Sequence, residues 1–227
     1  MLRFVSWCLA GLARAASARA HFAFVVPDKE GATAIVIFSD DLSPDENVPV
    51  TKIAGTKLTL RAADTKPAAL DWKKGEHCYE LKLSGKGFRV IQGTTEYGVL
   101  TKGKDKKETF LLRYHPRAVV GVPAEPMKPD AELPVEIIPV FEKGKLRLLV
   151  AAKGKPVADA EVNVILPDNK KQKVKTDAKG LTDAFEETGR YGAYVLQSQD
   201  KSGERDGKKY DQIRNYATLV VSVAPAK

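Results

Sequence analysis

The sequence predicts an all-β protein made of two antiparallel β-sandwich domains of the Ig-like kind. Short segments rich in β-branched and aromatic residues recur along the chain, separated by Gly, Pro, Asp and Lys turns at intervals of about eight to twelve residues. A proline-rich stretch, VPAEPMKPDAELP at 122–134, interrupts this series near its middle. Because proline stiffens the backbone and cannot donate to a strand ladder, we expect this stretch to link the two sandwiches.

Residues 1–20 have the pattern of a secretory signal peptide. A positive start at Arg3 is followed by an apolar run from Phe4 to Ala13 and by a small-x-small cleavage site, Ala18-Arg19-Ala20. The apolar run is too short to span a bilayer as a helix, and no later stretch reaches that length. We therefore expect a periplasmic or otherwise exported protein, whose mature chain starts at His21 and has no transmembrane segment.

The first sandwich is expected to occupy residues 21–121. Each of its predicted strands is a short apolar run bounded by turn residues. These strands are expected at 21–27, 33–39, 56–60, 77–83, 87–93 and 109–115.

The second sandwich is expected to occupy residues 135–227. Its strands are predicted at 135–140, 145–152, 160–167, 171–176, 192–199 and 216–223. Between two of them, TDAKG at 176–180 is expected to form a hairpin turn in which Gly180 supplies a positive φ angle. The one segment compatible with a helical turn is 206–216.

The charge pattern gives no support for a nucleic-acid partner. The net charge of +8 falls to +5 when cleavage removes Arg3, Arg14 and Arg19, and the lysines are scattered over predicted turns. No basic stripe interleaved with aromatic residues is present. The sequence also lacks a nucleophile elbow, a P-loop and a dinucleotide fingerprint, so we expect a protein that is not an enzyme.

His21 is the first candidate metal ligand. As the N-terminal residue of the mature chain it would offer its α-amino nitrogen and its ring Nδ1 to one ion, and a second imidazole would complete a three-nitrogen set suited to copper, with nickel also compatible. This arrangement resembles the histidine brace of exported copper-binding sandwiches and of lytic polysaccharide monooxygenases. The alternative is that a histidine follows the cleavage site by chance.

His77 and His115 are the candidates for the second nitrogen. In the predicted strand 77–83, alternation directs His77 toward the apolar face and Cys78 away from it, so this adjacent pair is not expected to share one metal. His115 ends the predicted strand 109–115, where Arg113 on the same face weakens a cation site. For both histidines the alternative is a hydrogen-bonded structural role.

Two other features of the sequence contain side chains that can ligate metals. Cys8 leaves with the signal peptide, so Cys78 is expected to remain alone, without a disulfide within the chain. The acidic loop 39–47 is expected to be a solvated turn, with Asp40 or Asp41 as an alternative oxygen ligand.

Seven segments share a pattern that extends over most of the chain: AHF (20–22), GTTEYGVL (93–100), FLLRYHPRA (110–118), LPVEIIPV (133–140), GKPVADAEV (154–162), GRYGAYV (189–195) and GKKYDQIRNYATLVV (207–221). Together they resemble an exported domain family of unknown function that is found beside nickel and cobalt uptake transporters. The second half also resembles carboxypeptidase-regulatory-like, Ig-type domains through GKPVADAEV and GRYGAYV. The resemblance implies a periplasmic component whose partner is a membrane metal-uptake transporter.

These observations predict an exported, non-catalytic protein that binds nickel, cobalt or copper and assists its uptake or handling. The alternative is a metal-free structural or adhesive module of the cell envelope. A third candidate, a copper oxidase acting on polysaccharide, is disfavoured because only 7% of the residues are aromatic and such an enzyme needs a flat aromatic surface.

Overall fold

The structure is a computed structural model that describes residues 20–62, 65–103 and 107–224. Within these ranges the chain forms β-sheets and one short 3-10 helix, η1 (Val50–Ile53), which confirms the predicted all-β class. The same ranges contain no helix with the length and hydrophobicity of a membrane span. The predicted signal peptide lies outside the described residues except for Ala20.

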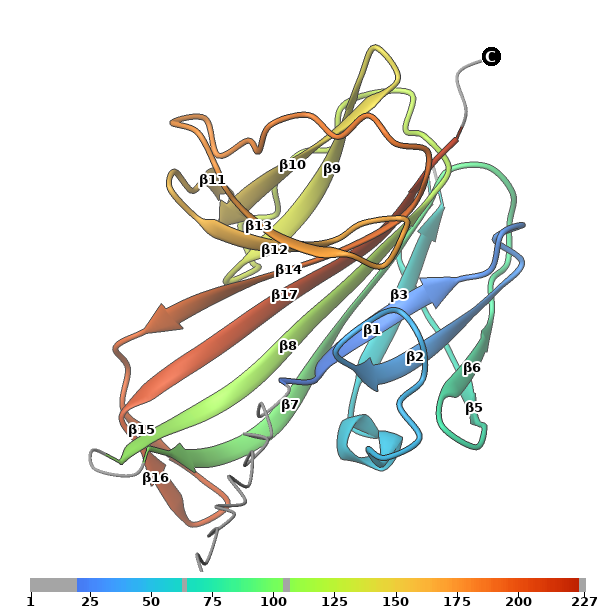
Figure 1. Cartoon of the computed structure of the whole chain (residues 1–227). Helices are drawn as coiled ribbons and strands as arrows, with labels where there is room; N and C mark the ends of the chain where they lie inside the picture. Colours follow the sequence, from blue (N-terminus) through green and yellow to red (C-terminus); the bar gives the residue numbers. More distant parts are fainter. Residues whose placement is uncertain (1–19, 63–64, 104–106, 225–227) are drawn as a thin grey trace, which may run out of the picture.

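A long, twisted sheet of eight strands forms the centre of the molecule (Figure 1). Four of its strands, β14, β17, β8 and β7, are much longer than the rest and lie side by side in its middle. In spatial order the eight strands are β13 (Lys171–Lys175), β12 (Glu161–Ile165), β14 (Gly189–Gln199), β17 (Gln212–Val223), β8 (Glu108–Val120), β7 (Arg89–Lys102), β3 (Lys57–Ala62) and β4 (Ala68–Ala69).

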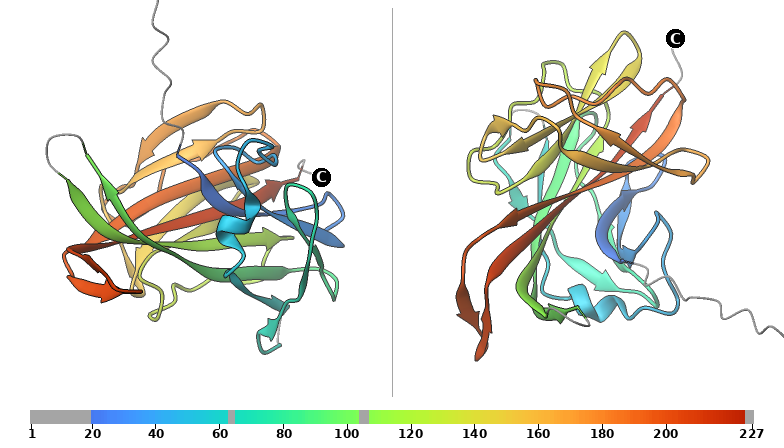
Figure 2. Two further views of the ribbon diagram at one scale, coloured as in Figure 1. Left: turned by 90° about the horizontal axis from the view of Figure 1, so that it is seen from below. Right: turned by 60° about the vertical axis from the view of Figure 1, so that its left-hand side comes forward.

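Smaller sheets cover the two faces of this central sheet (Figures 1 and 2). One contains β1 (Phe22–Pro27), β2 (Thr33–Ser39), β6 (Tyr79–Lys82) and β5 (Trp72–Lys74) in that order. The other contains β11 (Lys155–Pro156), β10 (Lys145–Ala152) and β9 (Glu136–Glu142). A hairpin of β15 (Gly203–Arg205) and β16 (Lys208–Tyr210) forms a separate two-stranded sheet.

Side-chain alternation along β8 shows how one sheet serves two hydrophobic cores. Phe110, Leu112 and Tyr114 belong to the first core, which lies against β1 and β2, whereas Val119 belongs to the second core, which lies against β9 and β10. Successive residues of a strand point to opposite faces, so even-numbered residues of β8 face the first core and odd-numbered residues the second.

The central sheet crosses the predicted domain boundary. Strand β8 precedes the proline-rich stretch 122–134 and β17 follows it, yet the two pair in parallel from Phe110–Gln212 to Val119–Val221. The stretch itself contains no strand. The two predicted sandwiches therefore share a sheet, and the domain bounds 21–121 and 135–227 stay a prediction.

Strand β1 lies at the edge of its sheet, but side chains of the central sheet occupy its free carbonyl groups. The Tyr114 hydroxyl donates to the His21 carbonyl oxygen at 3.0 Å, and the Thr218 hydroxyl donates to that of Ala23 at 2.7 Å. Arg190 donates to the Pro27 carbonyl oxygen at 2.7 Å. These bonds satisfy an edge that would otherwise be open to pairing, and they fix His21 against the central sheet.

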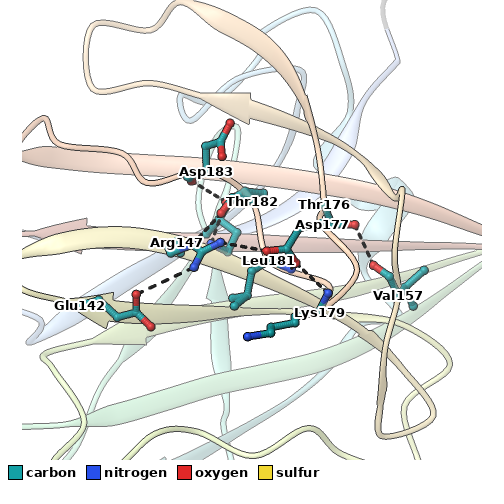
Figure 3. A network of polar contacts seen from close by, with 10 residues as sticks. Glu142, Arg147, Val157, Thr176, Asp177, Lys179, Leu181, Thr182 and Asp183 are labelled. Carbon is teal, nitrogen blue, oxygen red and sulfur yellow. Dashed lines mark hydrogen bonds and ion pairs between the residues drawn. The ribbon is translucent and has the colours of Figure 1, made fainter.

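A turn within the predicted segment 176–180 is confirmed (Figure 3), but it is not a hairpin turn, because β13 and β14 are not neighbours in the sheet. Gly180 has a φ angle of 76°, and a Cβ there would lie 2.9 Å from the Val150 carbonyl oxygen. Asp177 Oδ1 accepts from the Leu181 backbone N–H at 2.9 Å, and Asp177 Oδ2 lies 3.1 Å from Arg147 Nη2. The backbone bond from Leu181 is the largest hydrogen-bonding cause that lowers the pKa of Asp177, although partial desolvation opposes it.

Two predictions of local structure are wrong. The segment 206–216 holds no helical turn, because it forms β16 and the start of β17, where Ile213 and Asn215 are both buried at strand spacing. The strand predicted at 77–83 begins only at Tyr79, so His77 and Cys78 lie in the bend between β5 and β6.

Candidate functional site

His21 directly precedes β1, and its ring is held by Asp45 from the loop that follows β2. Its Nε2 lies 2.8 Å from Asp45 Oδ2, and both side chains are mostly buried, with 17% and 18% of their surfaces exposed. The ring centroid also lies 5.7 Å from that of Phe38 at the end of β2. The hydrogen bond from Tyr114 to the His21 carbonyl fixes the backbone, so both ring and backbone of His21 are anchored.

The contact with Asp45 decides which ring nitrogen of His21 has a free lone pair. An ionised carboxylate only accepts hydrogen bonds, so Nε2 carries the hydrogen in this pair. In the neutral ring Nδ1 is then the nitrogen with the lone pair. The bond from His21 is the largest cause that lowers the pKa of Asp45, followed by the backbone bond from Asn47, and it keeps this carboxylate ionised at neutral pH.

His21 borders a cavity of about 220 Å³ on the first-core side of the central sheet. Its walls combine aromatic rings with three cationic side chains. The aromatic residues are Phe22, Phe38, Tyr97, Phe110, Tyr114 and Tyr216, and the cations are Lys52, Lys102 and Arg214.

A β-bulge in β7 shapes one wall of this cavity. The register between β7 and β8 shifts between Glu96 and Gly98, and Gly98 has a φ angle of 118°. Tyr97 and Leu100 both border the cavity, although they are three positions apart and regular alternation would place them on opposite faces. The motif GTTEYGVL therefore supplies two wall residues because it contains this bulge.

The tyrosines of the cavity are neutral hydrogen-bonding groups. Burial raises the pKa of Tyr97, Tyr114 and Tyr216. Their phenols therefore keep their protons at neutral pH, and none offers a phenolate oxygen to a metal. Arg214 stacks over Phe110, with its Cζ 3.9 Å from the ring centroid, and also pairs with Glu108 at 2.5 Å.

Comparison with known proteins identifies the family. Residues 18–199 match the family model described as "Domain of unknown function (DUF4198)". The chain belongs to this family. The DUF4198 match includes His21, Asp45 and all strands from β1 to β14, whereas β15, β16 and β17 lie beyond it.

The other comparisons add little. A search of curated proteins finds no match to the chain. Among solved structures, the chain is similar to native alpha-2-macroglobulin from Escherichia coli, in a crystal structure spanning domains MG0-NIE-MG1. The identity is 14%, the match covers 87% of this chain and 69% of that chain, and the TM-score is 0.19. A likeness with so low a TM-score carries no argument about fold or function.

His115 lies on the opposite face of the central sheet of this DUF4198 chain from His21. Tyr114 reaches the His21 carbonyl on the first-core side, and His115, as the next residue of β8, points to the second-core side. There its Nε2 lies 3.1 Å from Asn215 Oδ1, and its Nδ1 lies 3.5 Å from Thr94 Oγ1. The structure therefore does not bring His115 and His21 together, and His115 as a second nitrogen stays a prediction.

His77 and Cys78 are oriented opposite to the prediction, because neither is part of β6. The His77 side chain is 35% exposed and lies 3.6 Å from Glu76, whereas Cys78 packs against the first core. Burial, followed by the charge of Glu80, raises the pKa of the Cys78 thiol, which disfavours the thiolate that ligates metals. Strand β2 separates β6 from β1, so their backbones lie about 10 Å apart at the usual strand spacing.

Asp45 is the site residue that sequence analysis missed. In the acidic loop the sequence indicates Asp40 or Asp41 as an oxygen ligand, but Asp40 pairs with Lys171 at 3.1 Å, and Asp41 accepts from the Ser43 backbone N–H at 2.7 Å. Only the fold reveals that Asp45 contacts a residue 24 positions earlier. Within the described ranges, no group of three or more His, Cys, Asp and Glu side chains is arranged to hold a metal ion.

Proposed function

We propose that the protein is exported, is cleaved after Ala20, and binds a divalent transition metal at His21 as its N-terminal residue, without catalysing a reaction. The ligands from this chain are the α-amino nitrogen and Nδ1 of His21. The ion is copper on the chemistry of this two-nitrogen chelate, or nickel or cobalt on the resemblance to the transporter-associated family. The protein assists the uptake or handling of this ion.

The hydrogen bond from His21 Nε2 to Asp45 carries the proposal. Histidines that ligate metals commonly donate their second ring N–H to a carboxylate, which fixes the tautomer, orients the ring and makes the ligating nitrogen more basic. Here the bond is 2.8 Å long and leaves Nδ1 as the free nitrogen. Nδ1 is also the ring nitrogen nearer to the α-amino group, so both donors can reach one ion.

The donor set of His21 is small, which favours transfer of the ion over storage. Two nitrogens leave several coordination positions to water or to ligands from another protein. Such an open site suits an ion that is passed on to a membrane metal-uptake transporter. In this proposal residues 135–227, as an Ig-type carboxypeptidase-regulatory-like half, support and space the metal-binding half.

One observation favours the alternative of a metal-free structural or adhesive module. Lys52, Lys102 and Arg214 border the cavity beside His21, and their positive charge opposes a bound cation. In that case the Asp45–His21 bond would serve only to anchor the N-terminal strand.

Two measurements test this proposal: the identity of the first residue of the exported protein, and the electron paramagnetic resonance spectrum of its copper-loaded form. Mass spectrometry of the chain purified from the cell envelope is expected to give His21 as the first residue. Electron paramagnetic resonance of the Cu²⁺-loaded protein is expected to show coupling to an imidazole nitrogen. This coupling is expected to be lost in a His21→Ala chain that also starts at residue 21, although its α-amino nitrogen remains. A mature chain that starts elsewhere, or an unchanged spectrum in His21→Ala, rejects the proposal in favour of the structural module.

A further inference from the structure

A second cavity lies on the opposite face of the central sheet, beneath the proline-rich stretch. It has a volume of about 320 Å³. Strands β3, β7 and β8 form its floor through residues such as Thr59, Gln92 and Arg117, and residues 127–130 form its other wall. The prolines of that wall restrict its backbone, so the shape of the cavity is largely preformed.

The floor of this cavity is a row of polar side chains across three strands. Thr59 is paired with Gln92, and Gln92 is paired with Arg117. Arg117 is only 5% exposed. Its Nη2 donates to Gln92 Oε1 at 2.6 Å and lies 2.7 Å from Glu136 Oε2, so one arm of the guanidinium is held by the protein.

The other arm of Arg117 has no partner. Nη1 is buried and makes no hydrogen bond to any residue that the structure describes. A buried charged donor without an acceptor is costly, and it is rare in folded proteins unless a ligand or water supplies the acceptor. The missing acceptor has to be an electron-rich oxygen, because a guanidinium only donates.

Two further cations border the same cavity. Arg61 and Lys128 form no ion pair with another described residue. Arg61 and Arg117 border the same cavity. Burial is the main cause that lowers the pKa of Arg117, the negative charges of Glu136 and Asp130 raise it, and repulsion by Arg61, the smallest of these effects, lowers it. An anion between Arg61 and Arg117 would remove this repulsion.

The acidic groups nearby are mostly engaged by the protein, but Glu136 Oε2, which lies 2.7 Å from Arg117 Nη2, makes no hydrogen bond to a described residue. Glu136 Oε1 accepts from the Asp130 backbone N–H at 2.5 Å, and Asp130 Oδ1 accepts from the Glu132 backbone N–H at 2.9 Å. Asp130 also borders the cavity, where Arg61, Arg117 and Lys128 outnumber it. The cavity therefore keeps an excess of positive charge.

We propose that this cavity binds a small organic carboxylate. One carboxylate oxygen accepts from Arg117 Nη1, and the group lies between Arg117 and Arg61, where planar guanidinium groups suit carboxylate geometry. The cavity is larger than an inorganic anion needs, and Met127, Pro129 and Val90 give it an apolar wall for the carbon skeleton. This proposal is independent of the metal site, because the two lie on opposite faces of the central sheet.

The test is a titration of the full mature chain with succinate, followed by protein-observed NMR and calorimetry. Succinate is expected to bind saturably and to shift the signals of residues 127–130. Arg61→Gln and Lys128→Gln are each expected to weaken binding about tenfold, the effect of losing one charge-assisted contact. Lys208→Gln removes one exposed charge from the distant β16 and is expected to leave the affinity unchanged.

Each other outcome overturns the proposal. An absence of saturable binding means that water satisfies Arg117. Equal weakening in Lys208→Gln means that the basic surface attracts succinate without a site. Inorganic phosphate that competes as well as succinate, or succinamide that binds as tightly, means that the cavity does not select organic carboxylates. Because Arg61 and Lys128 are exposed, their variants are expected to fold.

Discussion

The three histidines differ in what their ring nitrogens contact. His21 gives one nitrogen to a carboxylate and keeps the other free, whereas His115 has both nitrogens within reach of neutral polar groups, Asn215 and Thr94. His77 is the most exposed of the three and lies beside Glu76 in a bend. Only His21 thus has the environment of a metal ligand, with a carboxylate behind it and a cavity beside it.

Replacing Asp45 with asparagine tests the orienting role of this carboxylate. Asp45→Asn keeps the shape of the side chain but removes its charge, so Nδ1 of His21 becomes less basic and less well oriented. Loss of such a partner costs roughly ten- to a hundredfold in metal affinity. Calorimetric titration with Cu²⁺ measures this loss of affinity. The control is Glu46→Gln, which removes the same charge from the same loop. Equal effects of the two substitutions would contradict the role of Asp45.

His115 predicts a pH dependence of stability. Its pKa is lowered mainly by burial, with a smaller effect of Arg113, while the bond to Asn215 opposes the shift. The unfolded chain therefore binds a proton more readily than the folded one below about pH 6.5. The contribution of the neutral His115 ring to the free energy of unfolding is complete above that pH, and it is lost as the pH falls toward the lowered pKa of the folded state. Urea denaturation at about pH 7.5 and about pH 5.5 measures this effect. The free energy of unfolding is expected to fall more between these two pH values in the wild type than in His115→Gln. Equal decreases would be inconsistent with a buried neutral His115.

At the scale of elements, β1 is stabilised by side chains of the central sheet as well as by its pairing with β2. All six residues of β1 are buried, and hydrogen bonds from Tyr114, Thr218 and Arg190 reach its outer carbonyl groups. The strand that carries His21 is therefore bound to the molecule on both sides.

Thr218→Val is expected to weaken this attachment. Thr218 is fully buried, and valine has nearly the same shape, so the substitution removes the hydroxyl that donates to the Ala23 carbonyl and leaves that oxygen without this donor. The free energy of unfolding should fall by about 1–3 kcal/mol. Chemical denaturation measures this loss, and Thr101→Val, at an exposed strand position, should change stability little. A neutral Thr218→Val would show that the bond does not stabilise β1.

Strand patterns in the sequence located most elements because alternation and turn residues are local signals. The segments 33–39 and 145–152 match β2 and β10 residue for residue. The alternating pattern at 77–83 predicts a strand over the whole segment, but pairing with β2 begins only at Tyr79, so His77 and Cys78 lie outside the strand. Whether a residue has a pairing partner depends on distant strands, so the orientation of His77 was not available from its own neighbourhood.

At the scale of the whole molecule, the central sheet joins the two halves of the chain. The pairing of β8 with β17 links residues about a hundred positions apart, and the first and second cores use opposite faces of the same strands. The sequence contains both strands but no local signal that they pair, because parallel pairing across a long connection leaves no turn motif. For the same reason the contact between Asp45 and His21 and the separation of His115 from His21 could not be predicted.

A shared sheet predicts a single cooperative unfolding transition. Loss of β17 would expose an edge of β8 and uncover both cores, so neither half is expected to unfold alone. Differential scanning calorimetry should give one peak whose calorimetric and van't Hoff enthalpies agree. Two resolved peaks would instead indicate independent domains joined at 122–134.

The central claim of a metal site at the N-terminal His21 is tested most directly by one calorimetric experiment. The chain beginning at His21 is titrated with Cu²⁺ before and after selective acetylation of its α-amino group, which removes the amine donor and leaves the imidazole and Asp45 unchanged. The free amine should bind one ion per chain, and the acetylated chain should lose this binding. Equal affinity of both forms, or no binding to either, would contradict the claim.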